Sequence, residues 1–501
     1  MKKLSLFSLI ILLCCLKTIA QTQAPFTPIK YNSDNQNLII PEEYEYHVLF
    51  REQDYVYATP GQKALAKKNH DYIAFIPGAG KDKASLYVSH ETNDSSSVLG
   101  DGGGATIFSI NNNKGTWERD GAFYNVDFNA VGGTYDNCGG FYIPETNRIL
   151  TAEEFPPKDN ITLYKKGRGT RDTSDINGLK RFEHTGWMVE VDPSTRSATK
   201  KLYALGRYSH ESVCMSKDGK TLYMTDDNSP SVLFKFIANI AFQFDKGTLY
   251  AYNQTRVNDP WIVLPGELDS LVNIRDIAIR KGATIFMRME WMTLVNNKVY
   301  ITETGVDRFE LENAGITETQ VAYHLKHTIT DHVLEYPYGG LLELDLSTNK
   351  LKNILSGGQG TIDPVKHFSN PDAITQTIIE DKTWLVICED LIGKDKNRVK
   401  QQYGEAKEYL NEVWWLDTSI PNAKVDDLQR FVLAVPGAEC TGLCFSPDGE
   451  TLFLNIQHPS ATNAYPFEKS TTIAISRKKR TRGKKRAEQR PRDGFGVAIP
   501  F

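Results

Sequence analysis

The chain has 501 residues, of which 24% are charged and 11% aromatic, as is ordinary for a soluble globular protein. The net charge of -4 argues neither for nor against a nucleic-acid partner, and because no other feature indicates one, we expect none. The length allows several small domains or one large repetitive domain, so the order of strand and turn signals has to decide between them.

The first 20 residues are predicted to form a signal peptide. Met1-Lys2-Lys3 precedes an almost unbroken apolar run from Leu4 to Leu16, which is shorter than the about 20 residues of a transmembrane helix. Cys14 and Cys15 suggest a lipoprotein as the alternative, but a leucine stands before them instead of a small residue. We therefore expect an exported protein, periplasmic, cell-surface or secreted, without a membrane span.

Residues 21–475 are predicted to form one all-β domain. Short β-like runs alternate with Gly, Asn, Asp and Pro turns, and the Asp-Gly turns at Asp218 and Asp448 each lead into an aliphatic-aromatic strand. Six strands of this second type follow one another at intervals of about 60 to 90 residues: Ser85–Glu91, Arg148–Glu154, Thr221–Asp227, Lys298–Glu303, Thr383–Glu389 and Thr451–His458. Radial repetition of four-stranded sheets hides the edges of a long antiparallel chain. The count favours a six-bladed β-propeller with loop and helical insertions.

These strands end on polar residues, and five of the six end on a carboxylate. Carboxylates gathered at one end of every blade would repel one another unless cations neutralise them. A second candidate ligand precedes most of the strand ends by 13 to 18 residues: Cys138, Glu211, Glu290, Asp372 and Glu439. The repeated pair predicts a metal site at the centre of the propeller.

Five cysteines remain after the predicted signal peptide, namely Cys138, Cys214, Cys388, Cys440 and Cys444. An odd number leaves at least one thiol without an intramolecular partner. Carboxylates select hard cations such as calcium, whereas carboxylates with one thiolate can hold iron. Cations held by such residues would bind an anionic, oxygen-rich substrate, for which a phosphate ester is the best candidate.

Arg288 stands two residues before Glu290, so the two side chains would point to the same side of a strand. A guanidinium suits a phosphoryl group because its planar fork donates two hydrogen bonds. The spacing is equally compatible with a structural ion pair between Arg288 and the carboxylate.

Several of these motifs together resemble the PhoX family of alkaline phosphatases. They are Asn137-Cys138-Gly139-Gly140 with Thr151-Ala152-Glu153-Glu154, His210-Glu211 with Thr225-Asp226-Asp227, Arg288-Met289-Glu290-Trp291, Ser369-Asn370-Pro371-Asp372, and Ala438-Glu439-Cys440-Thr441-Gly442 with Asn455-Ile456-Gln457-His458-Pro459. The motifs occur in order from about residue 85 to 460. The resemblance implies an exported six-bladed propeller that hydrolyses phosphate monoesters with iron and calcium ions.

The resemblance also implies roles for individual residues. Cys138, Glu211 and Glu290 would be ligands on the iron side, and Arg288 would bind phosphate, so that Arg288 and Glu290 are the candidate catalytic residues. The implied calcium ligands are Glu91, Glu154, Asp226, Asp372, Glu389 and Glu439. The sequence departs from the family in carrying Lys2-Lys3 in place of a twin-arginine signal and Arg288-Met289-Glu290 in place of Arg-Pro-Glu.

Two alternatives remain open from the sequence. One is a calcium-dependent propeller phosphodiesterase or phytase-like hydrolase, and the other is a non-catalytic, calcium-stabilised binding module. Residues 476–501 form a basic tail, expected to be solvated, with contact to a polyanion or cell surface as the minority reading. We expect small phosphate esters as substrates and a monomeric protein.

Overall fold

The computed structural model describes residues 24–32, 35–58, 61–100, 102–165, 174–391 and 410–479. The predicted signal peptide lies outside the described residues, as does the basic tail from residue 480 onward. Within the described residues, no helix is both long enough and apolar enough to cross a membrane.

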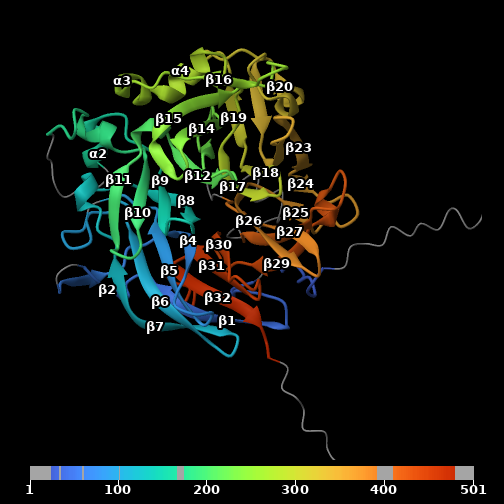
Figure 1. Ribbon diagram of the computed structural model, residues 1–501. Coiled ribbons are helices and arrows are strands. Elements are labelled where there is room, and N and C mark those ends of the chain that lie inside the picture. Colours follow the sequence, from blue (N-terminus) through green and yellow to red (C-terminus); the bar gives the residue numbers. More distant parts are fainter. Residues whose placement is uncertain are drawn as a thin grey trace, which may run out of the picture.

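Six large sheets follow one another along the chain and lie around a common centre, from the blue sheet to the red one in Figure 1. Sheet 1 consists of β4 (His70–Pro77), β5 (Lys83–His90), β6 (Ala105–Asn113) and β7 (Thr116–Asn125), extended by β2 (Tyr55–Tyr57) and β3 (Lys63–Leu65). Sheet 2 consists of β8 (Asn137–Ile143), β9 (Arg148–Glu153), β10 (Met188–Asp192) and β11 (Ser197–Lys201). Sheet 3 consists of β12 (His210–Met215), β13 (Thr221–Asp226), β14 (Phe234–Ile240), β15 (Gln243–Tyr252) and β16 (Trp261–Val263).

The other three large sheets repeat this order. Sheet 4 consists of β17 (Met289–Val295), β18 (Lys298–Glu303), β22 (Gly340–Asp345) and β23 (Lys350–Ser356). Sheet 5 consists of β26 (Pro371–Ile379), β27 (Lys382–Glu389), β28 (Glu412–Asp417) and β29 (Gln429–Leu433). Sheet 6 consists of β30 (Glu439–Phe445), β31 (Thr451–Gln457), β32 (Thr471–Arg477) and β1 (Tyr44–Arg51).

Sheet 6 joins the two ends of the domain, because β1 from the start of the chain pairs with β32 from its end. The first strands of the six sheets contact one another in cyclic order, β4 to β8, β12, β17, β26 and β30, and β30 contacts β4 again. These six strands therefore surround the centre, and each sheet runs outward from its first strand. The strand β32 continues two residues past the predicted domain boundary at 475.

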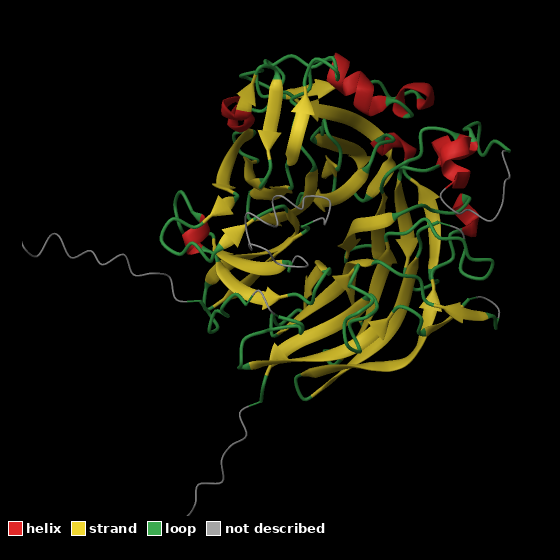
Figure 2. Cartoon of the chain, turned by 180° about the vertical axis from the view of Figure 1, so that it is seen from behind, coloured by secondary structure: helices red, strands yellow, loops and turns green. Residues whose placement is uncertain are grey.

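The remaining elements are short insertions, and strands dominate the fold (Figure 2). Two small sheets contain β19 (Val306–Glu310), β20 (Ile329–Thr330) and β21 (Val333–Tyr336), and β24 (Gly358–Gln359) with β25 (His367–Phe368). The helices are α2 (Asn160–Lys165), α3 (Leu268–Leu271), α4 (Ile274–Arg280), η1 (Asn129–Val131), η2 (Arg181–His184), η3 (Tyr203–Leu205), η4 (Tyr323–Thr328) and η5 (Val425–Asp427). The predicted all-β class is confirmed.

The second strands of the six sheets occupy the six segments that the sequence predicts. In β27 the run from Trp384 to Cys388 is buried without interruption, because neighbouring sheets cover both faces of the strand. The two predicted Asp-Gly turns are present: the amide of Gly219 donates to the Ser216 carbonyl at 3.1 Å, and that of Gly449 donates to the Ser446 carbonyl at 2.8 Å. Both glycines have positive φ, which a glycine adopts without steric cost.

Candidate active site

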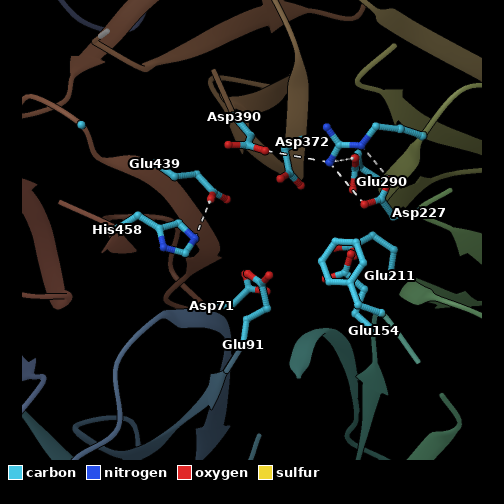
Figure 3. Close-up of a pocket in the computed structure, with 13 residues that line it drawn as sticks. Asp71, Glu91, Glu154, Glu211, Asp227, Glu290, Asp372, Asp390, Glu439 and His458 are labelled. Atoms are coloured by element: carbon cyan, nitrogen blue, oxygen red, sulfur yellow. Dashed lines mark hydrogen bonds and ion pairs between the residues drawn. The ribbon is translucent and has the colours of Figure 1, made fainter. Parts of the chain in front are cut away.

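A cavity of about 290 Å³ lies at the centre of the six sheets and is lined almost entirely by acids (Figure 3). Its lining residues are Asp71, Glu91, Glu154, Phe155, Glu211, Asp227, Arg288, Glu290, Asp372, Asp390, Gly437, Glu439 and His458. Nine carboxylates thus face a single arginine. They come from all parts of the chain, so the cavity exists only in the folded domain.

One set of these residues comes from the first strands of sheets 1 to 5. In each of these sheets the first residue of the first strand pairs with the second strand, and the register then shifts at a β-bulge. The residue inside the bulge turns toward the centre, because a bulge redirects one side chain out of the ladder. These residues are Asp71, Cys138, Glu211, Glu290 and Asp372.

In sheet 6 the bulge lies farther along the strand, between Thr441 and Cys444. Its first residue is Gly442, which carries no side chain, and the acid of this sheet, Glu439, comes from the start of β30. The Thr441 hydroxyl donates to Asp71 Oδ1 at 2.6 Å, so sheet 6 contributes a hydrogen bond to the acid of sheet 1.

A second set comes from the residues that immediately follow the second strands. In sheets 1 to 5 the backbone N–H of this residue donates to the carbonyl of the residue just before the first strand, at 2.8 to 3.0 Å. The donors are Glu91, Glu154, Asp227, Thr304 and Asp390, and the acceptors are Asn69, Asp136, Ser209, Arg288 and Asn370. This repeated bond fixes the backbone where each side chain leaves the sheet, and all of the donors except Thr304 line the cavity.

Sheet 4 departs from this pattern and supplies Arg288, the one arginine among the residues that line the cavity. The position after β18 is Thr304 instead of an acid, and its hydroxyl donates to the Pro371 carbonyl at 2.9 Å. The position before β17 is Arg288, whose φ of 56° lies in the left-handed region. Arg288 therefore lies just before β17 and not in it, but its side chain and that of Glu290 line the same cavity.

The Arg288 guanidinium is held by acids on two sides. Its Nε lies 2.9 Å from Asp227 Oδ1 and its Nη2 lies 3.2 Å from Asp227 Oδ2, a bidentate pair. Nη2 also lies 2.9 Å from Glu290 Oε1 and 3.9 Å from an oxygen of Asp390. Among the described residues, Nη1 donates no hydrogen bond, in contrast to Nε and Nη2. Burial opposes the charge of Arg288, but these acids outweigh burial and raise its pKa well above the usual range.

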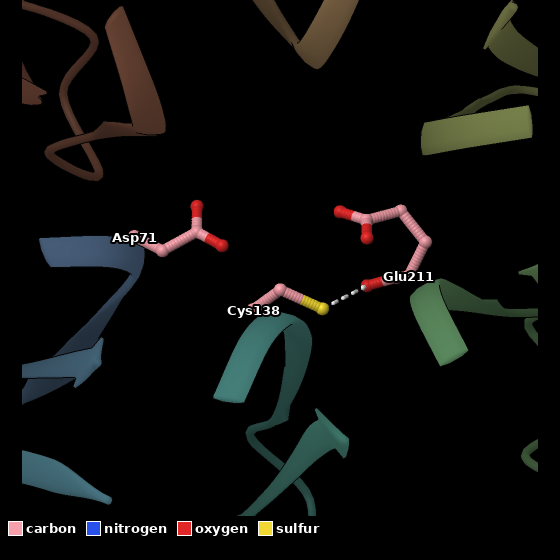
Figure 4. A group of neighbouring side chains, drawn as sticks. All are labelled: Asp71, Cys138 and Glu211. Carbon is pink, nitrogen blue, oxygen red and sulfur yellow. Dashed lines mark hydrogen bonds between the residues drawn. The ribbon is translucent and has the colours of Figure 1, made fainter. Parts of the chain in front are cut away.

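Two groups of ligand atoms lie close enough together to share an ion. Asp71, Cys138 and Glu211 form one group (Figure 4), and Glu211, Glu290 and Asp372 form the other, with the atoms of each group within 4.8 Å of one another. Asp372 Oδ1 is buried and has no hydrogen-bond partner among the described residues. An unsatisfied buried carboxylate oxygen is costly, and a cation at this position would satisfy it.

Cys138 does not line the cavity but lies next to its acids Asp71 and Glu211, with 1% of its surface exposed. Its Sγ lies 3.1 Å from the carbonyl oxygen of His210. Burial and the carboxylates of Glu211 and Glu154 raise the pKa of the Cys138 thiol well above its usual value. A cation beside the sulfur would reverse this effect, because a metal ion stabilises the thiolate.

The acids in the cavity destabilise one another's charged forms. Burial, followed by neighbouring carboxylates, raises the pKa of Glu211 and Glu154 well above the usual value. Burial raises the pKa of Asp71 to about 7 although Thr441 donates to it. The same two causes raise the pKa values of Glu91, Glu290, Asp372 and Glu439. The arrangement therefore favours bound cations, which would let these carboxylates stay ionised together.

The structure brings Cys138, Glu211, Glu290, Glu91, Glu154, Asp372, Glu439 and Arg288 of the predicted site together. It does not bring Asp226 or Glu389 into the cavity. Asp226 Oδ2 accepts from Arg275 Nε at 3.0 Å, and Glu389 accepts from the Ser369 amide and from Trp414 Nε1, each at 3.0 Å. Both residues end a strand and point away from the centre, because adjacent residues of an extended chain face opposite sides.

The neighbours Asp227 and Asp390 line the cavity instead. Asp71 and His458 were also missed as site residues. Pairs of adjacent acids in the sequence could have indicated the inward residue. In each pair the first acid ends the strand and the second turns into the cavity, as in Glu153-Glu154, Asp226-Asp227 and Glu389-Asp390.

The model of the alkaline phosphatase PhoX family matches residues 24–460. No curated protein matches the chain. Among solved structures, Pseudomonas fluorescens PhoX in complex with vanadate is similar, with 19% identity and a TM-score of 0.67 over 90% of this chain and 98% of that one. This likeness shows a shared fold.

Two further solved structures are less similar. A protein of unknown function from Dyadobacter fermentans has 9% identity and a TM-score of 0.43 over 87% of this chain and 100% of that one. A mutant Trypanosoma rangeli sialidase with trans-sialidase activity has 8% identity and a TM-score of 0.39 over 87% of this chain and 59% of that one. Neither bears on the site. Because the family match covers most of the chain, the chain belongs to the PhoX family and is an alkaline phosphatase.

Proposed function

We propose that the protein hydrolyses phosphate monoesters, releasing inorganic phosphate, with iron and calcium ions held in the central cavity. The observation that carries the proposal is the convergence of nine carboxylates and one arginine on a cavity of about 290 Å³. Vanadate, a transition-state analogue, occupies the related Pseudomonas fluorescens protein, which supports a phosphoryl group as the ligand here.

We assign the iron side to the two groups that share Glu211. Cys138 supplies the soft ligand, and Asp71, Glu290 and Asp372 supply hard oxygen ligands. The remaining cavity acids, which are Glu91, Glu154, Asp227, Asp390 and Glu439, are the candidate calcium ligands. When bound, the ions would neutralise charge on the phosphoryl oxygens and lower the pKa of a water molecule.

The chain's own residues bind and orient the ester. Arg288 presents the two N–H groups of Nη1 to a phosphoryl oxygen, while Asp227 fixes the plane of the guanidinium through its bidentate contact. Glu290 completes this support at 2.9 Å from Nη2. A guanidinium held in place before the substrate arrives stabilises developing charge without reorganising.

The six large sheets and the cyclic contacts of their first strands support a six-bladed propeller as the architecture. The pairing of β1 with β32 would close the ring. We further propose that residues 1–20 direct export, that residues 21–475 are one domain and 476–501 a tail, and that the protein acts as a monomer. Secretion of the full chain, with the signal removed, tests the first point.

Metal analysis and a phosphatase assay test the proposed function. Purified full-length protein should contain iron and calcium and hydrolyse a generic aryl phosphate. A protein that stays free of iron, and inactive when both metals are supplied, would refute the proposal.

Cys138→Ser separates iron from calcium dependence. This variant should lose iron while keeping calcium, and its kcat/KM should fall by at least about 100-fold, because an alcohol is a poor ligand for iron. Ser419→Ala, at an exposed turn outside the cavity lining, is the matched control for handling of the protein. Full activity of Cys138→Ser with calcium alone would favour the calcium-dependent hydrolase instead.

A further inference from the structure

Phe155 is the one aromatic carbocycle among the residues that line the cavity. It follows Glu154 directly, and 44% of its surface is exposed, so the ring lies at the mouth and not in the core. Removing a phenyl ring from water normally stabilises the fold, and this ring gains little in that way. Its position therefore calls for another explanation.

The backbone at Phe155 is strained. Its φ of 44° lies in the left-handed region, which bulky residues seldom adopt. A proline follows, and a residue before proline normally adopts an extended conformation at negative φ. Such strain persists only where surrounding contacts impose it, and it is common at binding sites.

Contacts on both sides impose this conformation. The Glu154 amide donates to the Asp136 carbonyl at 2.9 Å, and the Phe155 amide donates to Ser209 Oγ at 3.0 Å. Pro156 packs on Gly186, where an added Cβ would lie 2.6 Å from the Pro156 Cβ. The Pro157 carbonyl accepts from Arg207 Nη2 at 3.0 Å. The segment is held at four successive residues, and it presents an exposed phenyl ring.

The size of the cavity indicates where the rest of a substrate would lie. A cavity of about 290 Å³ is at the lower end of the range for small-molecule sites, and cations with a phosphoryl group would occupy much of it. The alcohol part of an ester must then sit at the mouth. Apart from Phe155 and Gly437, the residues that line the cavity are acids, Arg288 and His458. Phe155 therefore provides the apolar side chain of the lining.

We propose that Phe155 binds the alcohol part of the ester by stacking, and thereby makes the enzyme prefer aryl and nucleoside phosphates over small polyol phosphates. This inference rests on the proposed phosphatase function and adds its substrate class. Aromatic stacking accounts for a preference of about twofold to tenfold, and the contact would act on substrate binding, not on bond cleavage.

Steady-state kinetics of Phe155→Ala with three esters tests the proposal: 4-nitrophenyl phosphate, adenosine 5′-monophosphate and glycerol 2-phosphate. We expect KM for the two ring-bearing esters to rise about fivefold, with kcat nearly unchanged and with glycerol 2-phosphate affected less than about twofold. Inhibition by inorganic phosphate should stay the same, because phosphate lacks the stacking group.

Two further variants keep the test independent of folding. Phe155→Asn tolerates positive φ and should behave like Phe155→Ala, whereas Phe155→Trp should keep the preference for ring-bearing esters. Tyr323→Ala removes an aromatic side chain that is 60% exposed and does not line the cavity, and it should change nothing. An equal loss for all three esters, or no change for any, would overturn the inference. A wild-type protein inactive on every ester would instead refute the proposed function.

Discussion

Two rows of acids lie one residue apart at the ends of the second strands, and their side chains have different surroundings. The anchor row is Glu153, Asp226, Glu303 and Glu389, and the pocket row is Glu91, Glu154, Asp227 and Asp390. Every anchor acid is fully buried and accepts from donors of its own sheet or loops. The direction of the side chain distinguishes the two rows: the anchor acids point to donors within the fold, whereas the pocket acids face the cavity, where Asp227 accepts from Arg288.

Glu153 and Glu154 show the contrast most directly. Glu153 accepts from Lys201 Nζ at 2.7 Å and from the Trp187 amide at 3.0 Å, so its charge is paired inside the protein. No hydrogen-bond donor of the described residues reaches the Glu154 carboxylate, and burial with neighbouring acids raises its pKa well above normal. Glu153 therefore stabilises the fold through its ion pair, whereas a bound cation would stabilise the ionised form of Glu154.

The largest effect is expected for Glu211, which belongs to both groups of ligand atoms. Glu211→Gln should lower kcat/KM by at least about 10³-fold and reduce the bound metal. The metal-free variant should melt no lower than metal-free wild type, because a repelling charge has been removed. Glu145→Gln, on the exposed surface, is the control. Full metal content in Glu211→Gln would contradict the assignment.

Replacing an anchor acid should lower the stability of the fold, in contrast to Glu211→Gln, which should lower metal binding and activity. Glu153→Ala leaves the Lys201 ammonium buried without its partner, and breaking a buried pair costs about 3–5 kcal/mol of unfolding free energy. Urea unfolding of the metal-free proteins measures this loss. Adding Lys201→Met to Glu153→Met should restore most of the stability, since no charge then remains buried. Unchanged stability in Glu153→Ala, with loss of metal, would place Glu153 in the pocket row.

Without bound metal, the stability of the protein should depend on pH, because the cavity acids are buried and close to one another. Burial raises the pKa of Asp71 to about 7 in the native state, above the 3.8 of an aspartate in an unfolded chain, so the native state binds more protons between these values. Unfolding free energy must then fall as pH rises through this window. We expect chelated protein to be less stable at pH 8 than at pH 5 by on the order of 3 kcal/mol.

Resupplied calcium and iron should reduce or reverse that difference, because bound cations stabilise the ionised carboxylates. Thermal melts at both pH values, with chelator and with metals, provide the comparison. Chelated protein that is equally stable at pH 5 and pH 8 would show that the cavity acids do not repel one another.

The sequence alone predicted the positions of the six second strands, because each strand is an aliphatic-aromatic run with turn residues beside it. It also found the inward residue of each bulge in sheets 2 to 5, where Cys138, Glu211, Glu290 and Asp372 stand in distinctive motifs. It could not decide between the two acids of a pair such as Asp226-Asp227. A shift of one residue reverses the facing of a side chain, and the donors that select the anchor, such as Arg275, are distant in sequence.

The smallest effect, and the sharpest separation of the two rows, is expected from that same pair. Asp226→Asn keeps an acceptor for the Val232 amide and Arg275, so it should cost about 1 kcal/mol of stability and change kcat/KM less than about twofold. Asp227→Asn breaks the bidentate contact with Arg288 and should lower kcat/KM by about 10-fold to 100-fold, with little loss of stability. Urea unfolding and aryl phosphate kinetics on the two variants measure both quantities. The opposite pattern, with activity lost in Asp226→Asn and kept in Asp227→Asn, would exchange the two rows, because the residues differ only in which way the strand end directs them.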